Sequence, residues 1–169
     1  MERTTKMKLA LSIPLIIISA LFDQLSKYLV VTHIKNNEII TALPNILHFV
    51  YLENTGITFG LFNDLPVILR LPILILIPLG VMAFLIYMLS KVEPYERIIT
   101  IAYSLILGGA IGNIFDRIFY GYVVDFIQIN IYIMWWPAFN IADSVIVIGM
   151  VLLCFEVLRG KQIFETKNP

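Results

Sequence analysis

Four long apolar stretches constrain the fold of this chain more than any other feature of its sequence. They cover residues 9–31, 66–89, 98–118 and 139–158, and each has the length of about 20 residues that a helix needs to cross a bilayer. The composition agrees, since 59% of the residues are hydrophobic and 14% are charged, whereas a soluble domain carries about a quarter charged residues. The sequence therefore predicts an all-α membrane protein, a single domain over residues 1–169 with four transmembrane helices.

The basic residues predict how these helices are oriented. Eight of the twelve Lys and Arg residues flank the spans on one side, which is the bias found in cytoplasmic loops. They are Arg3, Lys6, Lys8, Lys91, Arg97, Arg159, Lys161 and Lys167. We therefore expect both termini to be cytoplasmic and the loops 32–65 and 119–138 to lie outside. The N-terminus is similar to a secretory signal, but no small-residue cleavage site follows, so we expect it to remain as the first span.

The two outer loops are more apolar than the loops of soluble proteins. Residues 39–62 contain β-prone runs broken by turn residues, which predicts a small sheet or cradle at the bilayer surface. Residues 118–136 are rich in aromatic side chains, and Trp135 and Trp136 suit the headgroup region. We expect both loops to touch lipid or an apolar substrate. The alternative is that they only cap a four-helix bundle.

Several kinds of function find no support in the composition. The net charge is zero, which gives no electrostatic reason to expect a nucleic-acid partner. Cys154 is the single cysteine and His33 and His48 are the two histidines, so neither a disulfide framework nor a metal site is predicted. No cofactor is expected, and nothing in the sequence demands more than a monomer.

Polar residues gather at the predicted outer ends of the spans. Ionisable side chains inside a membrane are costly and by default indicate a functional site. The residues concerned are Asp23, Asn113, Asp116, Arg117, Asp125, Asn140 and Asp143. A purely structural interpretation is also open, in which the asparagines join helices and Asp116 forms an interfacial ion pair with Arg117. We favour that interpretation for Asp116.

Asp125 and Asp143 are the strongest candidates for chemistry, because neither has a neighbouring cation in the sequence. Two carboxyl groups close together in a low dielectric share one proton. The ionised member can take a proton from an attacking water while the other donates one to a peptide carbonyl, as in an aspartic protease. Two other classes stay open on these residues alone. One is a proton-coupled transporter, and the other is a metal-dependent enzyme acting on lipid phosphates.

Close helix packing is predicted near these residues. Gly108 and Gly112 form a G-x-x-x-G pattern in the third span, which allows another helix to approach. General packing of the bundle explains this pattern without any chemistry.

Four motifs in order along the chain give a more specific indication. They are DQLSK at 23–27, ENTGITFGLF at 53–62, GGAIGNIFDR at 108–117 with GYVVDFI at 121–127, and PAFNIADS at 137–144. Together they resemble the signal peptidase II family of bacterial membrane aspartic proteases. One departure is that Ile57 and Thr58 follow the glycine of the second motif, where a small residue is usual, which would alter the shape of the cradle.

The resemblance implies an endopeptidase of the bacterial inner membrane. Such enzymes remove the signal peptide from diacylglyceryl-modified prolipoproteins, cutting just before the lipidated cysteine, and cyclic depsipeptide antibiotics occupy their site. The implied fold is a four-helix bundle with an extracytoplasmic β-cradle and an interfacial helix in the second outer loop. On this resemblance Asp125 and Asp143 are the catalytic pair. The implied supporting residues are Asp23, Asn54, Asn113, Arg117 and Asn140.

Overall fold

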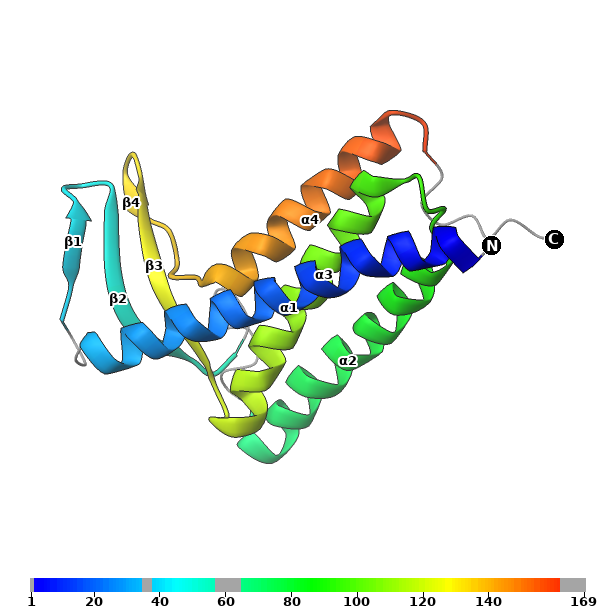
Figure 1. The fold of residues 1–169 in the computed structure, drawn as a ribbon. Coiled ribbons are helices and arrows are strands. Elements are labelled where there is room, and N and C mark those ends of the chain that lie inside the picture. The colour runs from blue at the N-terminus through cyan, green and yellow to red at the C-terminus, as the bar shows by residue number, and fades with distance from the viewer. Residues whose placement is uncertain (1, 35–37, 57–64, 162–169) are drawn as a thin grey trace.

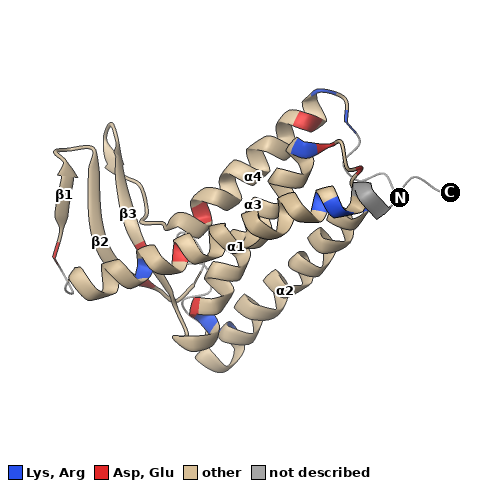
Figure 2. Cartoon of the chain, in the orientation of Figure 1, with Lys and Arg blue, Asp and Glu red and all other residues tan. Residues whose placement is uncertain are grey.

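Four helices form the body of the protein (Figure 1). The computed structural model describes residues 2–34, 38–56 and 65–161, with side chains from residue 5 onward. The helices are α1 (Glu2–His33), α2 (Val67–Lys91), α3 (Arg97–Phe119) and α4 (Ile141–Leu158). Each is long and apolar enough to span a membrane, which confirms the four predicted spans. Figure 2 shows that the charged residues gather toward the ends of the helices. The start of α1 and the end of α4 lie at the same end of the bundle (Figure 1).

The most buried of the four helices is α3, which packs against α1, α2 and α4. Its glycines explain the close approach. A Cβ on Gly108 would lie 2.6 Å from the Cβ of Ser19 on α1, and one on Gly112 would collide with the carboxylate of Asp23. The predicted G-x-x-x-G face therefore does receive another helix, and it brings α1 against α3 at the level of Asp23.

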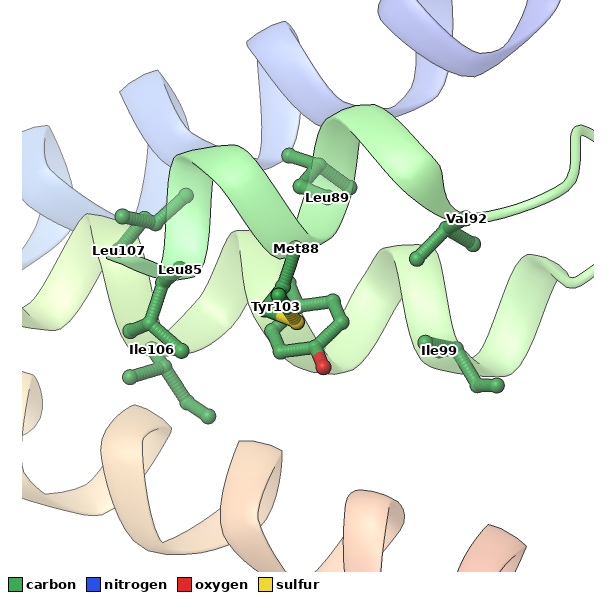
Figure 3. Close-up of a cluster of buried hydrophobic side chains, with 8 residues drawn as sticks. All are labelled: Leu85, Met88, Leu89, Val92, Ile99, Tyr103, Ile106 and Leu107. Atoms are coloured by element: carbon green, nitrogen blue, oxygen red, sulfur yellow. The ribbon is translucent and has the colours of Figure 1, made fainter. Parts of the chain in front are cut away.

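At the end of the bundle where α1 begins and α4 ends, apolar side chains of α2, of α3 and of Val92 between them form a buried cluster (Figure 3). The cluster consists of Leu85, Met88, Leu89, Val92, Ile99, Tyr103, Ile106 and Leu107. Beside it, the ammonium of Lys8 donates to the backbone carbonyl oxygens of Leu89, Ser90 and Val92. Lys8 thus supplies further donors to the carbonyl groups at and just after the end of α2, where the last turn lacks its full set of N–H partners.

A small antiparallel sheet lies at the opposite end of the bundle, which we call the sheet end (Figure 1). Its strand order is β1 (Ile40–Leu43), β2 (Leu47–Asn54), β3 (Val123–Ile131) and β4 (Met134–Trp135). Val124 and Phe126 of β3 pack on Val30 and Ile34 at the end of α1, and this contact attaches the sheet to the bundle. The predicted sheet is therefore confirmed for the described residues. Residues 57–62 of the second motif, including Ile57 and Thr58, lie outside them.

The second outer loop does not contain the interfacial helix that the family resemblance implied. Residues 123–131 form β3 and not an interfacial helix. The sequence VVDFIQINI is rich in β-branched residues, which favour a strand, and β2 supplies the hydrogen-bonding partner. Gly121 makes the turn possible, since its φ of +81° lies in the left-handed region that glycine adopts readily. The N–H group of Gly121 donates to the carbonyl oxygen of Arg117, and α3 ends there, directly before the strand.

Candidate active site

Asp125 and Asp143 line one cavity at the sheet end of the bundle. Asp125 lies on β3, and Asp143 lies in the first turn of α4. The cavity has a volume of about 670 Å³ and is also lined by Asn54, Asn113 and Arg117. Its remaining wall is largely apolar and consists of Val123, Trp136, Pro137, Ala138, Phe139, Ser144, Ile146, Val147 and Ile148. The fold thus brings together two carboxyl groups that come from different elements.

Asp125 is buried and receives two hydrogen bonds from amide side chains. Asn54 Nδ2 donates to its Oδ2 at 2.8 Å, and Asn140 Nδ2 donates to its Oδ1 at 2.7 Å. The amide oxygen of Asn54 in turn accepts from the backbone N–H of Gly56, which orients the amide. Burial raises the pKa of Asp125 to about 7, with a further increase from Asp143 and partial opposition from the two amides and Lys27. This carboxyl therefore changes its protonation state near neutral pH.

Asp143 is held at the N-terminus of α4 by a reciprocal cap. The N-cap residue Asn140 accepts through Oδ1 from the backbone N–H of Asp143 at 2.9 Å, and Asp143 Oδ2 accepts from the backbone N–H of Asn140 at 3.3 Å. This is the capping-box arrangement that starts a helix. The other carboxylate oxygen, Oδ1, accepts from Asn113 Nδ2 at 2.8 Å. Asn140 therefore contacts both aspartates, one through its amide nitrogen and one through its amide oxygen.

Arg117 approaches the cavity from α3. Its guanidinium donates to the carbonyl oxygen of Gly56 at 3.2 Å and interacts electrostatically with Asp143 and Asp125. The proposed ion pair between Arg117 and Asp116 is wrong. Successive residues of a helix point in different directions, and Asp116 faces α1, where its Oδ2 lies 2.8 Å from Lys27 Nζ.

Asp23 does not line the cavity. It is completely buried, with its Oδ2 2.7 Å from Lys27 Nζ, and its Oδ1 accepts from the backbone N–H of Ala142 on α4. Sequence reasoning overlooked Lys27, although its spacing of four residues from Asp23 places both side chains on one face of the helix. An i,i+4 pair of opposite charges inside an apolar span was the available signal.

The donor set of the site suits proton transfer. Two carboxyl groups with amide donors, one of them titrating near neutrality, can exchange a proton with a bound substrate or water. Among the residues that the structure describes, no group of three or more His, Cys, Asp or Glu side chains is arranged to hold a metal ion.

The arrangement of helices and sheet is similar to that of solved bacterial membrane enzymes. One, determined by the in meso method at 1.9 Å resolution, superposes with a TM-score of 0.79 and 32% identity, covering 89% of this chain and 94% of that one. Another, at 2.3 Å resolution, has the same TM-score with 31% identity and covers 94% and 93%. Fold and site thus define a multi-pass membrane enzyme.

Sequence comparisons identify the family. The family model described as signal peptidase (SPase) II matches residues 15–159. The lipoprotein signal peptidase of Thermodesulfovibrio yellowstonii is 44% identical over 152 residues, which are 90% of this chain and 95% of that protein. That of Aquifex aeolicus is 38% identical over 161 residues, 95% and 91% of the two chains. The chain belongs to the signal peptidase II family and is a membrane protease.

Proposed function

We propose that this protein is an aspartic endopeptidase that removes the signal peptide from diacylglyceryl-modified prolipoproteins, cutting before the lipidated cysteine. Asp125 and Asp143, which we call the dyad, perform the reaction. The observation that carries the proposal is that both line one cavity and share Asn140 as a hydrogen-bonding partner. Membership of the signal peptidase II family and the names of the relatives support the substrate class.

The mechanism follows from the coupling between the two carboxyl groups. With one proton between them, the ionised carboxylate takes a proton from water as the water oxygen bonds to the scissile carbonyl carbon. The protonated carboxyl donates to the carbonyl oxygen, which gives a tetrahedral intermediate. When the C–N bond breaks, the leaving nitrogen takes up a proton from the carboxyl that gained it from water. A hydroxyl of the intermediate returns its proton to the other carboxylate as the carbonyl group re-forms, so the dyad again holds one proton. The pKa of Asp125 near 7 makes this exchange accessible at neutral pH.

The remaining predicted site residues have supporting roles in this proposal. Asn54 and Asn140 donate to Asp125, and Asn113 donates to Asp143. Arg117 interacts electrostatically with both members of the dyad and, through Gly56, with the end of β2. Asp23 supports the first turn of α4 through its bond to the backbone of Ala142.

The apolar wall of the cavity suits a lipidated substrate. Trp136, Pro137, Ile146 and Val147 line it next to the dyad, and Val147 is largely exposed on α4, where a spanning helix faces lipid. A signal helix can reach the dyad along this side while its acyl chains stay in the bilayer. We further propose that the protein lies in the bacterial inner membrane as a monomer, with its termini in the cytoplasm and the sheet end outside. A cyclic depsipeptide inhibitor would compete for the same cavity.

A gel-shift cleavage assay in detergent with EDTA present tests the proposal. The wild type should cleave a diacylglyceryl-modified prolipoprotein and leave its unlipidated precursor intact. Asp125→Asn and Asp143→Asn should each abolish cleavage while binding of the substrate is retained. Glu53→Gln is a matched control, because Glu53 is a carboxylate of the same sheet that bonds to Tyr51 outside the dyad, and this variant should cleave normally.

Each other result has a definite meaning. Cleavage by either dyad variant would refute the assignment of the two aspartates. If the wild type cleaves without EDTA and does not cleave with EDTA present, the reaction depends on a metal ion. A folded wild type that cleaves neither substrate but moves protons across liposomes would indicate a transporter.

A further inference from the structure

A buried lysine contacts Asn113, which lines the cavity. Lys27 of α1 is 3% exposed, and its Nζ lies 2.7 Å from Asp23 Oδ2 and 2.8 Å from Asp116 Oδ2. The same Nζ donates to Asn113 Oδ1 at 3.0 Å. An ammonium group has three N–H donors, and here each of the three has an acceptor. The position of Lys27 is therefore fixed from three sides.

The two carboxylates that bind Lys27 also hold the backbone beside the dyad. Asp116 Oδ2 accepts from the N–H of Val124 at 3.1 Å, and Asp23 Oδ1 accepts from the N–H of Ala142 at 2.9 Å. In sequence, Val124 and Ala142 immediately precede the two members of the dyad. Lys27 thus binds both carboxylates. One of them holds the backbone of β3 next to Asp125, and the other holds the backbone of α4 next to Asp143.

The third contact of Lys27 orients an amide of the site. An ammonium cannot accept a hydrogen bond, so Asn113 must turn its amide oxygen toward Lys27. Its amide nitrogen then faces Asp143 and donates to Oδ1 at 2.8 Å. A flipped amide would place an N–H group against the ammonium and an oxygen against a carboxylate, and both contacts would be repulsive. Asn140 Nδ2 also donates to the amide oxygen of Asn113, at 3.2 Å. Lys27 and Asn140 together therefore orient Asn113 so that Asp143 receives a donor.

We propose that Lys27 is a positioning residue for the dyad, which sets the separation of β3 and α4 through Asp116 and Asp23 and orients the donor to Asp143. This inference rests on the proposed function of Asp125 and Asp143.

The charge of Lys27 gives this role a measurable signature. In the part of the chain that the structure describes, the charged groups that interact with Asp125 are Asp143 on α4, Arg117 on α3 and Lys27 on α1. Burial and Asp143 raise the pKa of Asp125, and Lys27 is one of the groups that lower it. Without Lys27 the pKa of Asp125 rises further. The acidic limb of the pH–activity profile then moves to higher pH, because a higher pH is needed to remove the first proton from the two carboxyl groups.

The test uses a charge-matched double variant, Lys27→Gln with Asp116→Asn. Removing Lys27 alone leaves two buried carboxylates facing each other, which endangers folding. With the three groups ionised, the wild-type cluster carries a net charge of −1, and the double variant keeps −1 on Asp23. We expect kcat to fall by about tenfold or more, as for small displacements of catalytic groups, with KM changed by less than about twofold. The acidic limb should still move to higher pH, because Lys27, and not Asp116, is among the groups that set the pKa of Asp125.

Lys8→Gln is the matched control. Lys8 is also a buried lysine of α1 with three acceptors, but they are backbone carbonyls at the other end of the bundle. This variant should lose thermal stability and keep the kcat and the acidic limb of the wild type. If the folded double variant matches Lys8→Gln in kcat and in the position of the acidic limb, Lys27 has only a structural role and the inference is refuted.

Asp125→Asn in the same assay separates this inference from the proposed function. If Asp125→Asn is inactive and the double variant is normal, only the role of Lys27 is refuted. If Asp125→Asn still cleaves the lipidated substrate, the dyad is refuted, and the inference about Lys27 is refuted with it.

Discussion

Replacing Asp125 with asparagine should remove a pH-dependent loss of stability from the folded protein. Burial raises the pKa of Asp125 from its ordinary value of 3.8 to about 7. Between these two values the folded state holds a proton that the unfolded state has lost, so the free energy of unfolding falls as the pH rises. The contribution is fully present below the unfolded pKa and is lost as the pH passes through 7. From pH 5 to pH 8 the loss amounts to about 2.5 kcal/mol.

The measurement is unfolding by SDS in mixed micelles, followed by tryptophan fluorescence at both pH values. The asparagine side chain does not titrate, so the free energy of unfolding of Asp125→Asn should fall by about 2.5 kcal/mol less between the two pH values than that of the wild type. Taking this difference cancels the other titrating groups that the two proteins share. Glu53→Gln should keep the wild-type pH dependence, because it leaves Asp125 and its partners in place. If the wild type and Asp125→Asn lose stability in parallel, burial does not raise the pKa of Asp125 and the electrostatic account of the site is wrong.

Two further predictions concern packing and hydrogen bonding at the site. Asn140→Ala removes the N-cap of α4 and the amide donor to Asp125, so the free energy of unfolding should fall by about 1 kcal/mol and cleavage should be lost. Asn140→Ser should recover the stability, since serine is a good N-cap, but it should not recover cleavage. An active serine variant would refute the role of Asn140 as a bridge between the two aspartates. Gly112→Ala should destabilise the protein by about 1–3 kcal/mol in the same SDS titration, because the new Cβ collides with the carboxylate of Asp23. Gly80→Ala is its control, since a Cβ there meets no atom within 4 Å, and the predicted collision is wrong if both variants unfold alike.

Much of the architecture could be predicted from the sequence because the signals are local. Each span is one uninterrupted apolar stretch, and a chain in lipid must satisfy its backbone within the helix, so length and hydropathy suffice to locate it. The turn at Gly121 and the capping motif at Asn140 and Asp143 also depend on short segments of the sequence, although neither was among the predictions. Acidic and amide residues at the ends of apolar spans are conspicuous for the same reason, which is why Asp125 and Asp143 could be selected before any contact was known.

The pairing of polar side chains from different elements was decided by the tertiary structure alone. Asp116 is adjacent to Arg117 in the chain, yet it pairs with Lys27, because its position on α3 directs it toward α1. The strand at 123–131 likewise needed β2 as a partner, and a β-prone run does not state which strand it will meet.

The sequence by itself thus determined four membrane spans, a small sheet and the residue types available for chemistry. Only the folded chain decided that one amide, Asn140, contacts both aspartates and that one buried cation connects the elements beneath them. The physical reason is that hydropathy acts along the chain, whereas a hydrogen bond or an ion pair depends on the direction of side chains from elements that meet only in space.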